Sequence, residues 1–168
     1  MNMTIRNERV DDVDTIKRLT AAAFDHEEHS SHTEQFIVDA LRRSKQLTVS
    51  LVAVENCKII GHVAISPVQV SSGANGWFGL GPISVWPDRQ GQGIGSALMK
   101  AALIELQRLG GIGCVVLGDP GYYGRFGFEA HPGLELPGVP NEYFQAQAFV
   151  GELPLGTVQY HQAFEAVD

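Results

Sequence analysis

Hydrophobic and polar positions follow two different periods along this chain, and these periods predict where helices and strands lie. Apolar residues that recur every three or four positions are typical of a helix with one buried face. This period predicts three helices, over residues 11–24, from residue 31 or 33 onward, and from the glycine-rich stretch 91–95 to Gly110. Two-residue alternation and β-branched runs predict strands at 4–8, 48–55, 59–70, 77–85, 114–117, 142–150 and 158–167.

Residues 122–126 are long enough for one or two further helical turns. The resulting element order is β-α-α-β-β-β-α-β-α-β-β, which predicts an α/β domain with a mixed sheet. Because the chain has 168 residues, close to the size of one ordinary domain, we expect residues 1–168 to form a single domain.

The charge of the chain excludes one class of partner. Twelve Lys and Arg residues against nineteen Asp and Glu residues give a net charge of −7, whereas a general nucleic-acid binder needs concentrated positive charge. No apolar run approaches a membrane-spanning length, and the first residues lack the pattern of a signal peptide. We therefore expect no nucleic-acid or membrane binding, and a cytoplasmic location.

The segment that carries chemistry is residues 80–99, which predicts a strand, a tight glycine turn and a helix. Such a turn leaves free backbone N–H groups at the positive end of the helix, where a phosphate or pyrophosphate binds. A P-loop would need a Gly-Lys-Ser/Thr ending, but Ser96-Ala97 follows Gly95. A dinucleotide fingerprint would need a glycine where Ser96 stands. Neither of these two phosphate motifs fits.

The spacing Gln90-x-x-Gly93-x-Gly95 resembles the acetyl-coenzyme A (acetyl-CoA) signature of the GNAT superfamily of N-acetyltransferases, in particular a bacterial branch of it. A second match follows one helix and one strand later, where the stretch 122–128, Tyr-Tyr-Gly-Arg-Phe-Gly-Phe, is similar to the family's Phe/Tyr-Tyr-x-x-x-Gly-Phe segment. The element order also fits the family. The resemblance therefore implies the GNAT acyl-CoA N-acyltransferase fold and acetyl transfer from acetyl-CoA to a primary amine.

The same resemblance implies which residues bind acetyl-CoA. Backbone N–H groups of the glycine loop would hold the pyrophosphate, and the main chain of the preceding strand end would pair with the pantetheine arm. The residues expected in these roles are Ile83, Ser84, Val85, Gln90, Gly91, Gln92, Gly93, Ile94, Gly95 and Ser96. Ile83 and Val85 also read as ordinary core positions.

Tyr123 matches the family tyrosine that often protonates the departing thiolate, so the resemblance implies that it is the catalytic general acid. Two alternatives stay open from the sequence. Tyr123 can instead pack in the core with Phe126 and Phe128, and the adjacent Tyr122 competes for the role. Arg125 reads either as a structural residue or as a contact to the coenzyme.

The base that deprotonates the amine is not fixed by the sequence. Many relatives carry a carboxylate on the strand before the glycine loop, but residues 77–85 contain none. Asp119 is one candidate, although Asp-Pro-Gly is also typical of a turn or helix cap. Water or an acid or histidine of the loop after the first helix could also serve, the candidates being Glu27, Glu28, His26 and His29.

Two other residue types carry less chemistry. His26, His29 and His32 lie in a polar stretch without periodicity, so no metal site is expected. Cys114 opens an apolar run and reads as a buried residue, which excludes it as an acyl carrier. We therefore expect direct attack in a ternary complex.

The acceptor is expected to be a small-molecule or peptide amine, and the negative charge of the chain suits a cationic one. In relatives, the two closing strands often form a homodimer. The alternative function, a non-catalytic acyl-CoA binding or sensor module, is kept open by the missing strand carboxylate.

Overall fold

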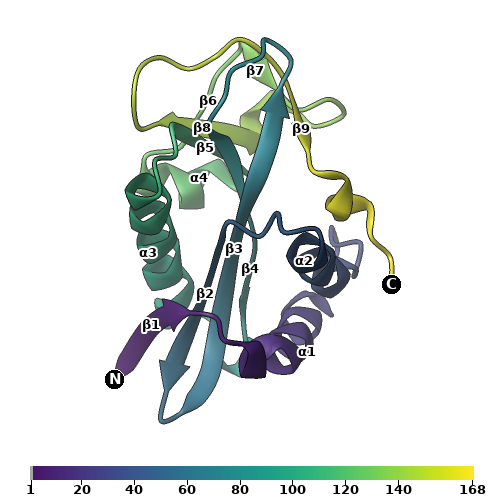
Figure 1. Ribbon diagram of the computed structural model, residues 1–168, viewed down its shortest axis with the longest axis vertical. Coiled ribbons are helices and arrows are strands. Elements are labelled where there is room, and N and C mark those ends of the chain that lie inside the picture. The colour runs from purple at the N-terminus through teal and green to yellow at the C-terminus, as the bar shows by residue number, and fades with distance from the viewer. Residues whose placement is uncertain (1) are drawn as a thin grey trace.

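The computed structural model describes residues 2–168 (Figure 1). The helices are α1 (Val13–Phe24), α2 (Glu34–Arg43), α3 (Ile94–Arg108) and α4 (Pro120–Tyr123). The strands are β1 (Met3–Asn7), β2 (Val49–Glu55), β3 (Lys58–Val70), β4 (Trp77–Val85), β5 (Gly113–Leu117), β6 (Glu129–Ala130), β7 (Leu134–Glu135), β8 (Phe144–Ala148) and β9 (Gly156–Tyr160).

The strands form one mixed sheet in the order β1-β2-β3-β4-β5-β8-β6. Neighbours along this order are antiparallel except β4 and β5, which run parallel. Helix α3 covers one face of the sheet, and α1 and α2 cover the other (Figure 1). The predicted α/β class with a mixed sheet is thus confirmed.

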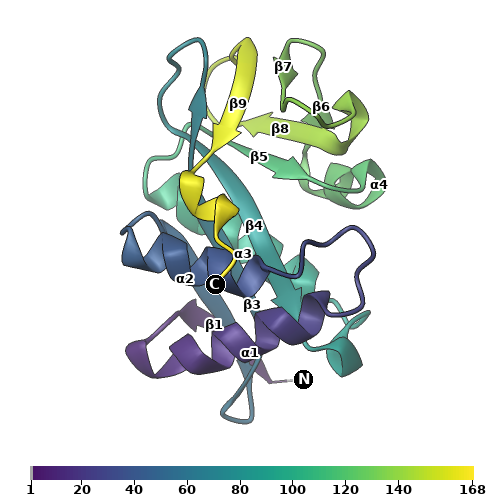
Figure 2. The ribbon, with the colours of Figure 1, turned by 90° about the vertical axis from the view of Figure 1, so that its right-hand side faces the viewer.

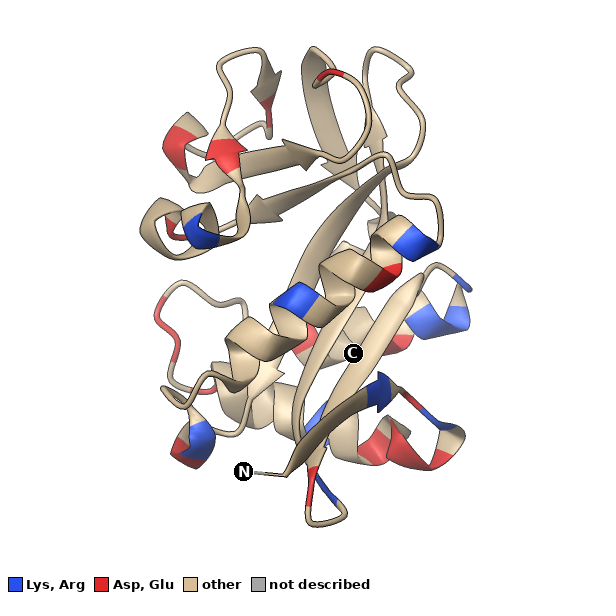
Figure 3. Ribbon diagram, turned by 90° about the vertical axis from the view of Figure 1, so that its left-hand side faces the viewer, with Lys and Arg blue, Asp and Glu red and all other residues tan. Residues whose placement is uncertain are grey.

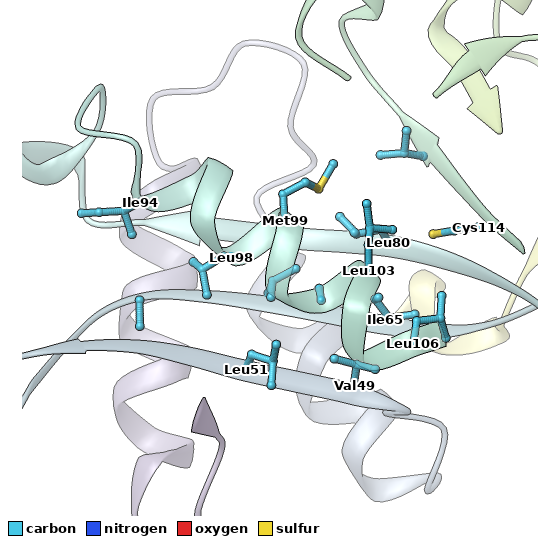
Figure 4. Packing of buried hydrophobic residues seen from close by; sticks show 14 of the residues in the cluster. Val49, Leu51, Ile65, Leu80, Ile94, Leu98, Met99, Leu103, Leu106 and Cys114 are labelled. Atoms are coloured by element: carbon cyan, nitrogen blue, oxygen red, sulfur yellow. The ribbon is translucent and has the colours of Figure 1, made fainter. Parts of the chain in front are cut away.

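The main core lies between α3 and the sheet (Figure 4). Leu98, Met99 and Leu106 of α3 are fully buried against the strands. Gly61 of β3 lets the helix approach closely, because a Cβ atom there would lie 2.8 Å from Leu98 Cδ1. This contact fixes the height of α3, and therefore of the loop before it, above the sheet.

The last third of the chain differs from the prediction. Two short strands, β6 and β7, follow α4 where only loops were expected, and the strand predicted at 158–167 ends at Tyr160. His161 stops that strand, because its Nδ1 accepts a hydrogen bond from the Ala163 N–H at 3.0 Å and starts a 3-10 turn. The two closing strands also do not pair with each other: β8 pairs with β5, and β9 pairs with β3.

Strands β4 and β5 separate soon after they meet, and Figure 2 shows their ends diverging. Only residues 77–79 of β4 pair with β5, although β4 continues to Val85 and β5 to Leu117. A bulge at Gly81-Pro82 accompanies the separation, since both residues lie opposite Ala64 alone in the ladder with β3. Bulges bend the strand that carries the extra residue, and proline donates no ladder hydrogen bond.

A buried polar chain ties β1, β2 and β3 to α2 on the other face. Arg42 donates to both carboxylate oxygens of Glu8 at 2.8 and 2.9 Å. Ser50 links Glu8 to His62, whose Nε2 lies 2.8 Å from the Ser50 hydroxyl. Because His62 is fully buried, desolvation lowers its pKa to about 4.

We expect His62 to make the stability of the protein depend on pH in a defined window. As the pH falls below 6.5, the unfolded chain binds a proton at this histidine while the folded protein does not. The free energy of unfolding should therefore fall by about 2 kcal/mol between about pH 7.5 and pH 5. Glu8 titrates below this window, because its hydrogen bonds to Arg42 and Ser50 outweigh its burial and lower its pKa.

Urea unfolding at a series of pH values measures this loss in the unchanged protein and in two variants. His62→Gln should flatten the decline, whereas His26→Gln, at an exposed histidine, should keep it. A decline of the same size in His62→Gln would refute the assignment.

Candidate active site

The glycine-rich loop between β4 and α3 presents a row of free backbone donors. Among the described residues 2–168, none accepts a hydrogen bond from the backbone N–H groups of residues 90–96. Gly91 and Gly93 make the turn with φ of +77° and +84°, a region that favours glycine. The row ends in the first turn of α3, where the helix dipole is positive. The loop is therefore suited to an anion such as a pyrophosphate.

A cavity of about 750 Å³ lies over this loop. Most residues that the sequence predicted for coenzyme binding line it: Ile83, Val85, Gln90, Gly91, Gly93, Ile94, Gly95 and Ser96. The other lining residues are Glu27, Arg89, Tyr122 and Arg125. The structure thus joins the end of β4, the glycine loop and the α4 region into one wall.

Ser84 and Gln92 do not line the cavity. The Ser84 side chain is buried, and its strand neighbour across the sheet is His62. The Gln92 side chain accepts a hydrogen bond from Arg89 Nε at 3.1 Å. These two residues could therefore contact the coenzyme only through their backbone. The sequence analysis also predicted backbone contacts for them.

The free edge of β4 faces this cavity. The Val85 carbonyl points away from β3, because it accepts a hydrogen bond from Gln90 Nε2 at 3.1 Å. Alternate residues of a strand direct their backbone groups to the same side, so Ile83 presents its N–H and C=O in the same direction. Since β5 has already separated from β4 here, an extended ligand can pair with this edge.

Two arginines place positive charge at the cavity. Arg125 donates to the Ser96 hydroxyl at 3.0 Å, and its guanidinium lies 5.0 Å from the centre of the Tyr122 ring. Arg89 forms an ion pair with Glu55 at 3.0 Å. The sequence reading left Arg125 undecided and did not identify Arg89. Arg89 directly precedes Gln90 of the glycine motif, and this position could have identified it in the sequence.

The two adjacent tyrosines have different surroundings. Tyr122 lines the cavity, with its hydroxyl 3.4 Å from that of Ser96. Tyr123 is partly buried and lies edge-on to Phe128, with ring centres 6.3 Å apart. Burial, then Tyr122 and Asp119, raise the pKa of Tyr123 to about 12. No hydrogen bond joins its hydroxyl to the rest of the described chain.

Asp119 and Cys114 are both engaged in structure. The Asp119 carboxylate accepts a hydrogen bond from the Gly121 N–H at 3.0 Å and caps α4, as its sequence context allowed. Cys114 is fully buried, and desolvation raises the pKa of its thiol. Within residues 2–168, no three potential ligand side chains come close enough to hold a metal ion.

A second cavity, of about 450 Å³, lies where β4 and β5 have separated. It contains the bulge residues Gly81 and Pro82 and the end of β5 at Leu117 and Gly118. Glu27, from the loop between α1 and α2, lines both cavities. The arrangement can therefore hold two ligands at once, with one carboxylate between them.

Across residues 2–168, the structure contains no helix of the length and apolar character that a membrane crossing requires.

Comparison with known proteins agrees with this geometry. The family model described as an acetyltransferase (GNAT) domain matches residues 4–131. The uncharacterized N-acetyltransferase YhbS of Escherichia coli strain K12 is 35% identical over 170 residues, which cover 96% of this chain and 98% of YhbS.

Two solved structures are similar over almost the whole chain. A GNAT family acetyltransferase from Brucella melitensis, solved with acetyl-CoA, is 48% identical with a TM-score of 0.87, covering 97% of this chain and 98% of that one. The Escherichia coli YhbS structure, solved with CoA, is 33% identical with a TM-score of 0.88, covering 99% and 93%. The chain therefore belongs to the GNAT family of acetyltransferases.

Proposed function

We propose that this acetyltransferase moves an acetyl group from acetyl-CoA to a primary amine by direct attack, with both substrates bound together. The observation that carries the proposal is the row of free N–H groups at residues 90–96, which opens into the cavity of about 750 Å³. The similar Brucella melitensis and Escherichia coli structures contain acetyl-CoA and CoA. The second cavity, at the separated ends of β4 and β5, would hold the amine.

The residues around the loop fit the coenzyme in charge and shape. The N–H groups of residues 90–96 would bind the pyrophosphate at the positive end of α3. Arg89 and Arg125 line the same cavity and would add positive charge. The backbone groups of Ile83 and Val85 that point away from β3 would hold the pantetheine arm as an added strand, with the arm replacing the Gln90 side chain at the Val85 carbonyl.

Tyr123 would act as the proton donor. Acetyl-CoA, when bound, supplies an acetyl group activated as a thioester. With a pKa raised to about 12, mainly by burial, Tyr123 stays protonated at neutral pH. It would donate its proton to the sulfur as the carbon–sulfur bond breaks, and then regain a proton from water.

Glu27 would accept the proton that the amine must lose before its nitrogen can attack. It is the carboxylate shared by both cavities, and its side chain makes no ion pair or hydrogen bond within residues 2–168. Asp119 is instead held in its helix cap. The nitrogen loses two protons as the ammonium group becomes an amide. Glu27 accepts the first and passes it to water. The second is released to water after the attack, and it balances the proton that Tyr123 gives to sulfur and regains from water.

Direct transfer is favoured over an acyl-enzyme route because the Cys114 thiol is buried and its pKa is raised. The alternative is a module that binds the coenzyme without turnover. It is supported by the absence of an acidic residue in β4 that could serve as the base. Two measurements distinguish acetyl transfer from binding without turnover. Thermal unfolding during titration with acetyl-CoA reports binding, and release of free thiol in the presence of amines reports acetyl transfer. Stabilisation without thiol release for any amine would favour the binding module.

We expect Tyr123→Phe to lower kcat by about 10²- to 10⁴-fold, the usual contribution of a positioned acid. The Kd for acetyl-CoA should stay unchanged, because the ring and its packing against Phe128 remain. Steady-state kinetics and calorimetric titration measure the two quantities. Tyr122→Phe is the matched control, and a larger loss of kcat in that variant would transfer the role to Tyr122.

We expect Gly95→Leu to weaken acetyl-CoA binding by about tenfold or more without unfolding the protein. A Cβ at Gly95 would have no neighbour closer than 3.5 Å, so the added side chain meets the cavity rather than the core. Leucine also favours helix more than glycine does. Thermal unfolding checks stability, and calorimetry measures the Kd.

Lys100→Leu, at an exposed position of the same helix, is the control for an added apolar side chain. An unchanged Kd in Gly95→Leu would exclude the glycine loop as the binding site.

A further inference from the structure

The second cavity has a lining that distinguishes among classes of amine. In Figure 2 the segments that surround it come together: the loop after α1, the C-terminal turn after β9, and the diverging ends of β4 and β5. Its residues are Phe24, Glu27, His29, Ser30, Glu34, Ile37, Leu80, Gly81, Pro82, Leu117, Gly118, Leu136, Tyr160 and Phe164.

Most of this wall is apolar and comes from six parts of the chain. Phe24 and Ile37 come from α1 and α2, and Leu80 and Leu117 from the separating strands. The C-terminal side is aromatic, since the rings of Tyr160 and Phe164 lie 4.9 Å apart, tilted by 45°. A ligand that fills this cavity must place apolar surface against it.

The polar side chains of the cavity are Glu27, His29, Ser30 and Glu34, from the loop after α1 and the start of α2, and Tyr160 from the end of β9. Glu27 and Glu34 are the two carboxylates, and both Glu34 oxygens accept a hydrogen bond from the Ser30 hydroxyl at 2.8 Å. No lysine or arginine lines the cavity. Figure 3 shows Asp and Glu positions, and no Lys or Arg position, on the loop after α1. The cavity therefore suits a ligand that places positive charge near these carboxylates and an apolar body against the remaining wall.

We infer that the acceptor is a small monoamine with a compact aromatic or branched aliphatic body, bound with its ammonium group at Glu27. This inference rests on the proposed acetyl transfer and specifies its substrate class. Glu27 borders both cavities, so an ammonium group held there lies next to the coenzyme site. The apolar body then fills the space between Leu117 and the Tyr160–Phe164 pair.

The same lining disfavours other cationic amines. A polyamine carries further charges along its length, and an aminoglycoside carries many hydroxyl groups, so both would bury polar groups against apolar walls. A free amino acid brings a carboxylate, which would lie near two glutamates without a lysine or arginine in the lining among residues 2–168. Phenethylamine and phenylalanine differ by that carboxylate alone, so their comparison isolates its effect.

The test uses the full chain with acetyl-CoA and a panel of phenethylamine, isopentylamine, phenylalanine, spermidine and an acetyl-free lysine peptide. Thiol release should give a kcat/KM for phenethylamine at least about tenfold above those for phenylalanine and spermidine. Preference for spermidine or the peptide would overturn the inference and leave acetyl transfer intact. Binding of acetyl-CoA without acetylation of any amine would overturn both the inference and the proposed acetyl transfer. Absence of acetyl-CoA binding would instead refute the proposed function.

A pair of matched variants tests whether the apolar wall binds the amine, because each variant introduces one positive charge. Leu117→Lys places a cation at the cavity at a residue that is already 47% exposed, so the fold should tolerate it. It should lower kcat/KM for phenethylamine by at least about tenfold and leave the Kd for acetyl-CoA unchanged. Ile104→Lys, at a 68% exposed position of α3 outside both cavities, should change neither. Equal kinetics in the two variants would overturn the inference.

A second pair tests the ammonium site. Glu27→Gln should raise the KM for phenethylamine by about three- to tenfold, lower kcat, and leave acetyl-CoA binding intact. Glu28→Gln, at the adjacent glutamate that lines neither cavity, should behave as the unchanged protein. Calorimetric titration of phenethylamine in the presence of CoA gives a readout independent of turnover. Unchanged amine binding in Glu27→Gln would overturn the assignment of the ammonium site.

Discussion

The early separation of β4 from β5 is the constraint on which the rest of the site depends. Parallel pairing is limited to residues 77–79, so β5 does not pair with the backbone of Ile83 and Val85. If the ladder had continued, β5 would pair with the free edge of β4, where an extended ligand could otherwise bind. It would also occupy the space of the second cavity. The Gly81-Pro82 bulge bends β4 at this point and forms part of the second cavity. Strand β4 thus lines both binding spaces, with Gly81 and Pro82 at the second cavity and with Ile83 and Val85 at the coenzyme cavity.

The glycine loop and its helix were predictable from the sequence because their signals are local. Gly91 and Gly93 need positive φ, and the apolar spacing of Leu98 and Leu106 defines the buried face of α3. The second cavity was not predictable in this way. Its walls come from loops without periodicity and from Tyr160, which two-residue alternation assigned to a strand that continued to residue 167. Only tertiary packing brings these segments together, and no local sequence pattern predicts that packing.

The candidate catalytic groups show the same division. Spacing pointed to Tyr123, but spacing could not say that burial would raise its pKa to about 12 while Tyr122 lined the coenzyme cavity. The cap role of Asp119 followed from the Asp-Pro-Gly pattern and is confirmed. Glu27 was one of several acids and histidines in a polar loop. Its position between the two cavities distinguishes it from Glu28, and that position depends on how the loop folds back over β4.

Two segments of the second cavity's wall lie outside the core cluster between α3 and the sheet. The loop after α1 and the residues that follow β9 contribute no residue to this cluster, whereas Leu80 of β4 belongs both to the cluster and to the cavity wall. Substitutions in these segments can therefore accumulate at small cost to folding. Descendants of one ancestral chain could diverge in the compounds they modify while inheriting the same coenzyme site, and an engineer could redirect the enzyme by the same route.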